Sequence, residues 1–314
     1  MHKTIQKILL LSLILINFPA LTYDTTTSKT PIEQTIIKLA QPISANQAMK
    51  KNINIDLLLA ENTHAPSSHK MNSHWEYQGK NGPRNWSKIK PEFSKCGEGL
   101  NQSPIDIRPA IEPRNHFNRF SLPYKANNRS LQRIEFHYSA GPGILLNNGH
   151  TIQFNVDNSD FADYMVYAGE RYELIQFHFH APSEHVENGR YYDMEIHLVH
   201  KNRHNELAVV GLLVRRGGHN QLIDALWHSM PTQKGQKNTI KFPINVIDLI
   251  PFNRAYYHYN GSLTTPPCSE KVKWFVMRDQ IYASYNQINY YKSIIKNNSR
   301  PPQKLNGRRI MESR

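Results

Sequence analysis

Six short segments between residues 133 and 277 limit the folds open to this chain, because each is alternating or continuously apolar and turn residues separate them. They are residues 133–138, 143–156, 163–180, 193–201, 207–216 and 271–277. Helical spacing of apolar residues is clearest in 220–230 and 278–295, which do not alternate with the strands. This order predicts a mostly β, single-domain fold with a large, mainly antiparallel sheet and peripheral helices. Segments 193–201 and 207–216 contain few polar positions and are expected at the centre of the sheet.

Two histidines share one face of an expected strand. Residues 173–185 read ELIQFHFHAPSEH, and side chains at positions i and i+2 of a strand point the same way. Gln176, His178 and His180 therefore lie on one face, and Phe177 and Phe179 lie on the other. The phenylalanine face buries readily, whereas the two imidazoles stand roughly 6–7 Å apart along the backbone and can converge on one ion.

A third histidine follows on the next expected strand, where Glu195 and His197 share a face. The segment between the two strands is long enough for a turn and an antiparallel return, which would bring His197 beside the first pair. Three neutral imidazoles and an open fourth position are the ligand set of a catalytic zinc, and they leave the ion its full charge to acidify water. Gln176 and Glu195 are suitable acceptors for the other ring N–H of such ligands.

Other interpretations of the histidine pattern remain open from the residues alone. A His-x-His pair also occurs on ordinary surface strands, and a cupin-type barrel binding iron or manganese is a rival enzyme class, although that site normally includes a carboxylate ligand. Metal analysis separates the two classes. His185, His200 and His204 are interpreted as structural or surface residues.

The N-terminal residues predict export. Lys3 and Lys7 precede an apolar run at 8–21, which has the length of a signal peptide and is short for a membrane span. We expect residues 1–23 to be this signal, with an uncleaved anchor or a buried helix as the alternatives. The mature protein is then periplasmic or secreted, without stable membrane insertion.

Composition changes sharply after this segment. Residues 24–72 are rich in Thr, Ser, Asn and Lys and contain no Phe, Trp or Tyr, which predicts a mobile linker. Short amphipathic helices at 31–40 and 55–60 are the alternative. Tryptophan, tyrosine and glycine turns begin at His74, so we expect the folded domain to occupy 73–310.

Charge and cysteine content narrow the partners and the compartment. The formal net charge is +13, but no basic stripe is interleaved with aromatic residues and no nucleic-acid motif is found, so no nucleic-acid partner is expected. Cys96 and Cys268 are the two cysteines of the chain. In an exported protein an even pair favours a disulfide, with two buried thiols as the alternative.

Nine motifs, in the same order as in the family, resemble the α-class carbonic anhydrases and extend from residue 74 to residue 308. They are HWEY…NGPRNW, NQSPIDI, LNNGH, QFHFH, SEH, EIHLVH, LAVVGLLV, GSLTTPPCSE and NNSRPPQKLNGR. The resemblance is to bacterial, exported members, and it implies a ten-stranded, mainly antiparallel sheet with the metal at the base of a conical cleft. Two departures, a short loop at 181–185 and Lys304 in place of a proline, do not involve the expected metal ligands.

The resemblance also implies a role for individual residues. Zinc would be held by His178, His180 and His197, with Gln176 and Glu195 as acceptors for the ligand histidines. The remaining implied roles are hydroxide orientation by Thr264 and Glu184, an apolar carbon dioxide wall of Val199, Val209 and Leu263, a bicarbonate contact by Thr265 and proton transfer by His150.

The implied function is zinc-dependent, reversible hydration of carbon dioxide to bicarbonate and a proton, through attack by zinc-bound hydroxide. Sulfonamides and small anions are expected as inhibitors. A zinc-binding or adhesion module on the same scaffold is the non-enzymatic alternative, but such relatives usually lack a ligand histidine, and all three are present here. Oligomerisation is left open by the sequence.

Overall fold

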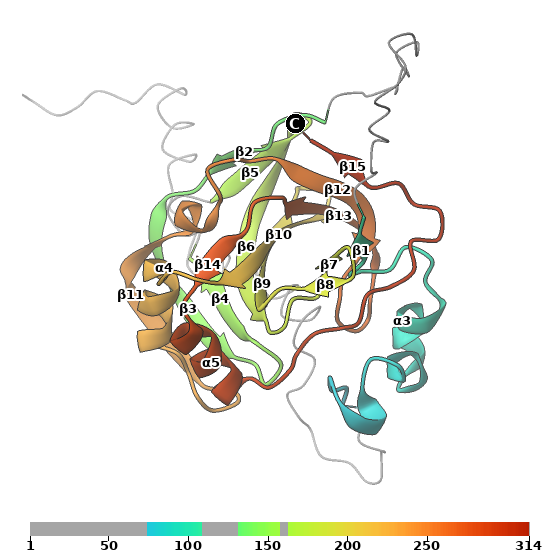
Figure 1. Cartoon of the computed structure of the whole chain (residues 1–314), viewed down its shortest axis with the longest axis horizontal. Helices are drawn as coiled ribbons and strands as arrows, with labels where there is room; N and C mark the ends of the chain where they lie inside the picture. The colour runs from blue at the N-terminus through green and yellow to red at the C-terminus, as the bar shows by residue number, and fades with distance from the viewer. Residues whose placement is uncertain (1–73, 109–130, 158–162, 314) are drawn as a thin grey trace, which may run out of the picture. The chain divides into compact units, whose positions relative to one another are not determined.

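The structure, a computed structural model, describes residues 74–108, 131–157 and 163–313. The expected signal peptide at 1–23 and linker at 24–72 lie outside these residues. Figure 1 shows the elements, and their bounds in chain order are η1 Gly79–Asn81, η2 Trp86–Lys88, η3 Pro91–Phe93, α3 Lys95–Glu98, β1 Asp106–Ile107, β2 Glu135–His137, β3 Ala140–Asn147, β4 Ile152–Val156, β5 Tyr164–Tyr167, β6 Glu170–His180, β7 Val186–Glu187, β8 Arg190–Tyr191, β9 Met194–Lys201, β10 Leu207–Arg216, α4 Gln221–His228, β11 Lys237–Asn245, η4 Val246–Leu249, β12 Tyr256–Ser262, β13 Glu270–Met277, β14 Ile281–Ala283, α5 Tyr285–Ile294 and β15 Met311–Glu312.

One large sheet organises the described residues. Its main path runs β11-β3-β4-β6-β9-β10-β13-β12-β15, while β14 pairs with β10 and β5 pairs with β6 and β2. Most pairs are antiparallel, as predicted, but β10 pairs in parallel with both β13 and β14. The sheet is therefore mixed, and in the described part of the chain it has twelve strands, whereas ten were expected. A parallel neighbour requires a long crossover connection, which strand patterning alone does not predict.

The two central strands are the ones with few polar positions. In β9 every residue but the last is buried, and most of β10 is buried as well. Both lie in the middle of the sheet in Figure 1, which agrees with the prediction.

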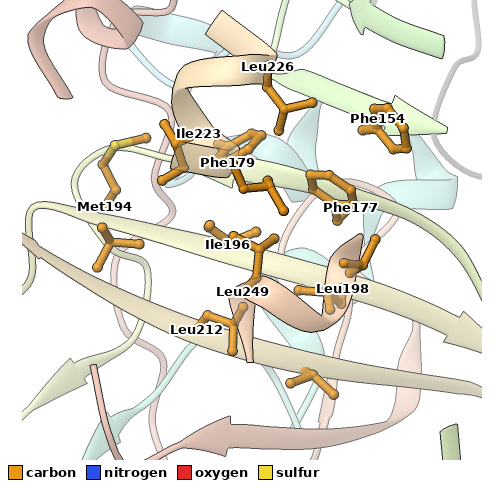
Figure 2. Close-up of a cluster of buried hydrophobic side chains, with 14 of the residues drawn as sticks. Phe154, Phe177, Phe179, Met194, Ile196, Leu198, Leu212, Ile223, Leu226 and Leu249 are labelled. Carbon is orange, nitrogen blue, oxygen red and sulfur yellow. The ribbon is translucent and has the colours of Figure 1, made fainter. Parts of the chain in front are cut away.

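The main core covers the face of the sheet that carries the phenylalanines. Figure 2 shows Phe177 and Phe179 of β6 near Ile223 and Leu226 of helix α4, with Ile196 of β9 in the same cluster. All five side chains are fully buried. Each contributes about 1.5–3 kcal/mol on burial, so this face of β6 is anchored, and the histidine face is held in a fixed direction.

The two helices near the sheet begin at capping residues. The Asn220 side chain accepts a hydrogen bond from the Ile223 backbone N–H at the start of α4. Ser284 and Gln287 form a reciprocal capping box at the start of α5. The expected helix at 278–295 is therefore wrong in its first part, because Ile281–Ala283 pairs with β10 as a strand and the helix begins only after the cap.

The short helical segment from η1 to α3 is joined to the sheet domain by a disulfide. Cys96 of α3 and Cys268 form a disulfide with Cα atoms 5.1 Å apart. Together with Trp86 and Phe93 they make a small buried cluster. The disulfide thus joins the N-terminal described segment to the loop that follows β12. Over the described ranges, no helix is long and apolar enough to cross a membrane.

Candidate metal centre

The register of β6 and β9 brings the three expected ligand histidines together. These strands are antiparallel, with His178 directly opposite His197 and His180 opposite Glu195. The ring centroids of His178 and His180 are 4.9 Å apart, those of His178 and His197 5.2 Å, and those of His180 and His197 4.5 Å. One ring nitrogen from each of the three lies within 4.8 Å of the other two. The strand faces read from the sequence therefore converge in space.

Hydrogen bonds determine which ring nitrogen faces the centre. His178 Nδ1–H donates to Gln176 Oε1 at 2.9 Å, and His197 Nε2–H donates to Glu195 Oε1 at 2.8 Å. His180 Nδ1–H donates to the Asn298 carbonyl at 2.8 Å. The nitrogens left over are Nε2 of His178 and His180 and Nδ1 of His197.

The free nitrogen of His180 shows that a partner is required. His180 Nε2 is buried and has no hydrogen-bond partner among the described residues. A buried polar atom without a partner is costly, typically about 1–3 kcal/mol, so such atoms usually mark a binding position. The donor set fits a metal ion that accepts neutral nitrogen ligands.

Burial keeps all three imidazoles in the form that binds metal. Burial lowers the pKa of His178 well below 6.5 and lowers that of His180 to about 4. Burial also lowers the pKa of His197, against an opposing effect of Glu195. At neutral pH these rings are unprotonated and each offers a lone pair.

Glu184 and Thr264 form a second polar pair beside the histidines. Glu184 is fully buried, and burial raises its pKa to about 7, although His197, the Arg300 backbone N–H and the Thr264 hydroxyl oppose this rise. The Thr264 hydroxyl lies close enough to the carboxylate to favour its charged form, and Glu184 Oε2 is left without a hydrogen-bond partner among the described residues. One Glu184 oxygen lies 3.9 Å from His197 Nδ1.

Two partners of the site come from a segment that the sequence analysis did not single out for the site. Asn298 supplies the carbonyl that holds His180, and the backbone N–H of Arg300 donates to Glu184 Oε1 at 2.8 Å. Asn298 also accepts from the Ala181 N–H through its side-chain oxygen. Contacts made by the backbone cannot be predicted from residue type. The motif NNSRPP indicated only that this segment belongs to the domain.

The free nitrogens face a cavity of about 410 Å³. Val199 and Val209 are paired across β9 and β10, and with Leu263 and Trp274 they belong to one buried apolar cluster that lines it. Thr264 and Thr265 line it too, as do Gln176 and the residues of the β3–β4 hairpin, Asn148, His150, Thr151 and Gln153. All of the expected wall residues thus reach one cavity, whereas Glu184 and Glu195 are buried behind it.

His150 lies at this cavity in an unexpected environment. Its ring stacks on Trp75 with centroids 3.7 Å apart, and the His74 ring is 5.0 Å away. Burial, together with the nearby His74 and Lys234, lowers the pKa of His150 to about 3. Proton transfer at neutral pH needs a ring with a pKa near the ordinary histidine value of about 6.5, and this stacked position does not provide it.

The remaining histidines of the notable segments are structural or exposed, as interpreted. His185 is buried, with Nδ1 2.7 Å from Glu195 Oε1 and Nε2 2.6 Å from the Tyr259 hydroxyl. Both of its nitrogens are therefore used, so the nearby group of His185, Glu195 and His197 is a weaker metal site than the first. His200 is buried against Tyr138, and His204 is exposed.

The fold agrees with comparison to known proteins. The family model for eukaryotic-type carbonic anhydrases matches residues 81–314, and the chain belongs to this family. It is 35% identical over 264 residues to a carbonic anhydrase from Pectobacterium atrosepticum, covering 84% of this chain and 100% of that protein. A carbonic anhydrase from Klebsiella pneumoniae is 37% identical over 241 residues, covering 76% of this chain and 91% of that protein.

Solved structures support the same assignment. The α-carbonic anhydrase from Thermovibrio ammonificans, in complex with the inhibitor sulfanilamide, matches with a TM-score of 0.67 and 37% identity over 76% of this chain and 98% of that chain. The resemblance seen in the motifs is confirmed. The protein is a carbonate dehydratase, in a family that hydrates carbon dioxide reversibly.

Proposed function

We propose that this chain hydrates carbon dioxide with a zinc ion held by Nε2 of His178, Nε2 of His180 and Nδ1 of His197. The observation that carries the proposal is the convergence of three neutral imidazoles, one partly exposed and two fully buried, each with its other nitrogen already bonded. When bound, zinc would lower the pKa of water to about 7, a magnitude taken from carbonic anhydrases themselves.

Thr264 and Glu184 orient the attacking oxygen. We assign the hydrogen of the Thr264 hydroxyl to the unpartnered Oε2 of Glu184, and in this arrangement threonine can only accept from the nucleophile. The nucleophile's hydrogen is then directed to threonine, and a lone pair is directed into the cavity. This is catalysis by positioning of the reacting atom.

The apolar cluster suits a substrate without a net dipole. Val199, Val209 and Leu263 offer carbon dioxide no hydrogen bond that would hold it away from the nucleophile. Thr265 lies at the same cavity and is the proposed contact for bicarbonate. His150 is the proposed route by which a proton leaves for the buffer.

Export and inhibition complete the proposal. The disulfide between Cys96 and Cys268 supports an oxidising compartment, so we place the protein in the periplasm or the medium. Since a related structure contains sulfanilamide, we expect sulfonamides to inhibit this chain as well.

Stopped-flow proton release on mixing the zinc-loaded protein with carbon dioxide tests the function. We expect turnover that a sulfonamide suppresses. His197→Ala should lose most of its bound zinc together with its activity, whereas His204→Ala, at an exposed histidine, should retain both. Full zinc content and normal turnover in His197→Ala would contradict the ligand assignment. Iron without zinc in the purified protein would favour the cupin-type alternative.

A further inference from the structure

Arg300 is a fully buried cation, and its guanidinium forms no ion pair with a carboxylate among the described residues. Its side chain is 1% exposed. Nη1 donates to Gln102 Oε1 at 2.9 Å and to the Ser103 carbonyl at 2.7 Å, and Nη2 donates to the Cys96 carbonyl at 2.8 Å. Burial of a charge is unfavourable unless the charged group is hydrogen-bonded. Here the charged guanidinium binds three neutral oxygens of residues 96–103 and holds this segment in place.

The same residue also holds the site. The Arg300 backbone N–H donates to Glu184 Oε1 at 2.8 Å. Glu184 in turn is the carboxylate to which the proposed function assigns the hydrogen of the Thr264 hydroxyl, through its unpartnered Oε2. The side chain of Arg300 therefore fixes the position of a backbone donor that touches the orienting carboxylate.

A second connection reaches Thr264 from the other side. Gln102, which accepts from Arg300, donates through Nε2 to the Cys268 carbonyl at 3.1 Å. Cys96, whose carbonyl also accepts from Arg300, is bonded covalently to Cys268. Cys268 belongs to the short loop that carries Thr264, and this loop closes on itself through the hydrogen bond from the Leu263 N–H to the Ser269 carbonyl.

We infer that Arg300 is a positioning residue for carbon dioxide hydration, which sets the relative placement of Glu184 and Thr264. The inference rests on the proposed function of these two residues. The guanidinium anchors both supports of the pair: the backbone donor to Glu184 and the segment beneath the Thr264 loop. Among the described residues, the Arg300 side chain has no hydrogen bond to the three histidines, and it does not belong to the apolar cluster that lines the cavity.

The physical consequence is specific to turnover. If Glu184 shifts, its carboxylate no longer fixes the direction of the Thr264 hydroxyl hydrogen. The hydroxyl can then donate into the cavity, and the nucleophile loses its orientation. Zinc binding depends on the histidines and carbon dioxide binding on the apolar wall, so both should persist. The loss should therefore appear in kcat and leave KM nearly unchanged.

Arg300→Lys is the first test variant, because lysine keeps the charge but cannot span three oxygens with a planar fork. We expect kcat to fall about tenfold, with unchanged zinc content. Arg278→Lys is the control: Arg278 pairs with Glu312 at 2.7 Å, and it has no hydrogen bond to residues 96–103 or to Glu184 among the described contacts. Its kcat should stay at the wild-type value.

A double-mutant cycle with Thr264→Ala separates positioning from general loss of structure. If Arg300 acts through the Glu184–Thr264 pair, Arg300→Lys should lower kcat far less in the Thr264→Ala background than in the wild type. Equal losses in the two backgrounds would overturn the inference. Gln102→Met removes the link to Cys268 and should show the same non-additivity, which keeps the test available if Arg300→Lys does not fold.

Hydrogen exchange on zinc-free protein gives a readout that does not depend on activity. The amides of Thr264 and Thr265 should exchange faster in Arg300→Lys than in wild type or Arg278→Lys. Unchanged exchange would contradict the connection through the loop. If the zinc-loaded wild type shows no hydration at all, the proposed function fails, whereas an active wild type with additive losses refutes only the role of Arg300.

Discussion

His150 and the ligand histidines show how strongly local surroundings alter one residue type. Burial lowers the pKa of both His178 and His180, and each ring has one nitrogen in a hydrogen bond. His150 is also neutral at pH 7, but its ring lies against Trp75 near a positive Lys234. Efficient proton transfer needs a pKa close to the working pH, so the ring must leave the indole before it can carry a proton at neutral pH.

We predict that His150→Ala slows turnover only when the buffer is weak. Zinc content and the carbon dioxide step, measured by isotope exchange, should stay at wild-type values, because the ring does not touch the ligand nitrogens. Steady-state turnover in dilute buffer should fall about tenfold or more and recover when imidazole is added.

Turnover that is unchanged in dilute buffer would remove His150 from the proton route. A titration of the His150 ring by NMR distinguishes a ring stacked on Trp75 from a ring that has left it. A pKa that stays near 3 corresponds to the stacked ring, and a pKa near 6.5 to a ring released from Trp75.

Residue patterns predicted those parts of the site in which a histidine and its hydrogen-bond acceptor lie on the same strand. Gln176 and His178, like Glu195 and His197, are two positions apart, so the period of a strand places each acceptor beside its histidine. The third acceptor, the Asn298 carbonyl, is 118 residues from His180 and belongs to the backbone. A backbone carbonyl is present in every residue, so the residue types do not indicate such a contact, and the sequence analysis missed it.

At the level of elements, apolar patterning predicted strands better than it predicted directions and boundaries. β9 and β10 were found because both of their faces are buried. The parallel pairing of β14 with β10 was missed, since Ile281 and Ala283 also fit the helical spacing of the following segment. The Ser284-x-x-Gln287 capping box is visible in the sequence and would have placed the helix start correctly.

The disulfide is the strongest single link between elements. It joins α3 to the loop after β12 across a sequence separation of 172. We predict that the double variant Cys96→Ser, Cys268→Ser has a free energy of unfolding lower by about 3–5 kcal/mol, because the unfolded chain is no longer constrained by so long a loop.

Chemical denaturation of the variant and of the reduced wild type checks this prediction. The two should unfold at similar, lowered denaturant concentrations, and a reducing agent should not affect the variant further. An unfolding midpoint equal to that of the oxidised wild type would show that the crosslink contributes nothing. Thiol titration of the denatured, unreduced protein should find no free cysteine.

For the whole molecule, buried neutral histidines couple stability to pH. Burial lowers the pKa of His200 to about 3, while its ring is held by Tyr138 and the Ala208 carbonyl. In the unfolded chain the same ring has a pKa near 6.5. Between pH 6.5 and pH 3 the unfolded state therefore binds one more proton than the folded state, and stability falls as pH falls.

We predict that His200→Gln weakens this dependence. Each such histidine contributes about 1.4 kcal/mol per pH unit within the window, so the slope of unfolding free energy against pH should decrease by up to this amount. Denaturation curves at pH 4, 5, 6 and 7 measure the slope separately from any overall loss of stability. Parallel lines for variant and wild type would exclude His200 as a source of acid sensitivity.

The contribution of residues 298–300 also has a consequence for biosynthesis. A nascent chain extended only to the end of α5 already contains the three histidines proposed as ligands, yet it lacks the carbonyl that orients His180 and the amide that holds Glu184. The Cys96 carbonyl and the Gln102 side chain still await Arg300 at that stage. On the proposed function, zinc can therefore bind in this ligand geometry only after this segment has been translated and has folded against the histidines.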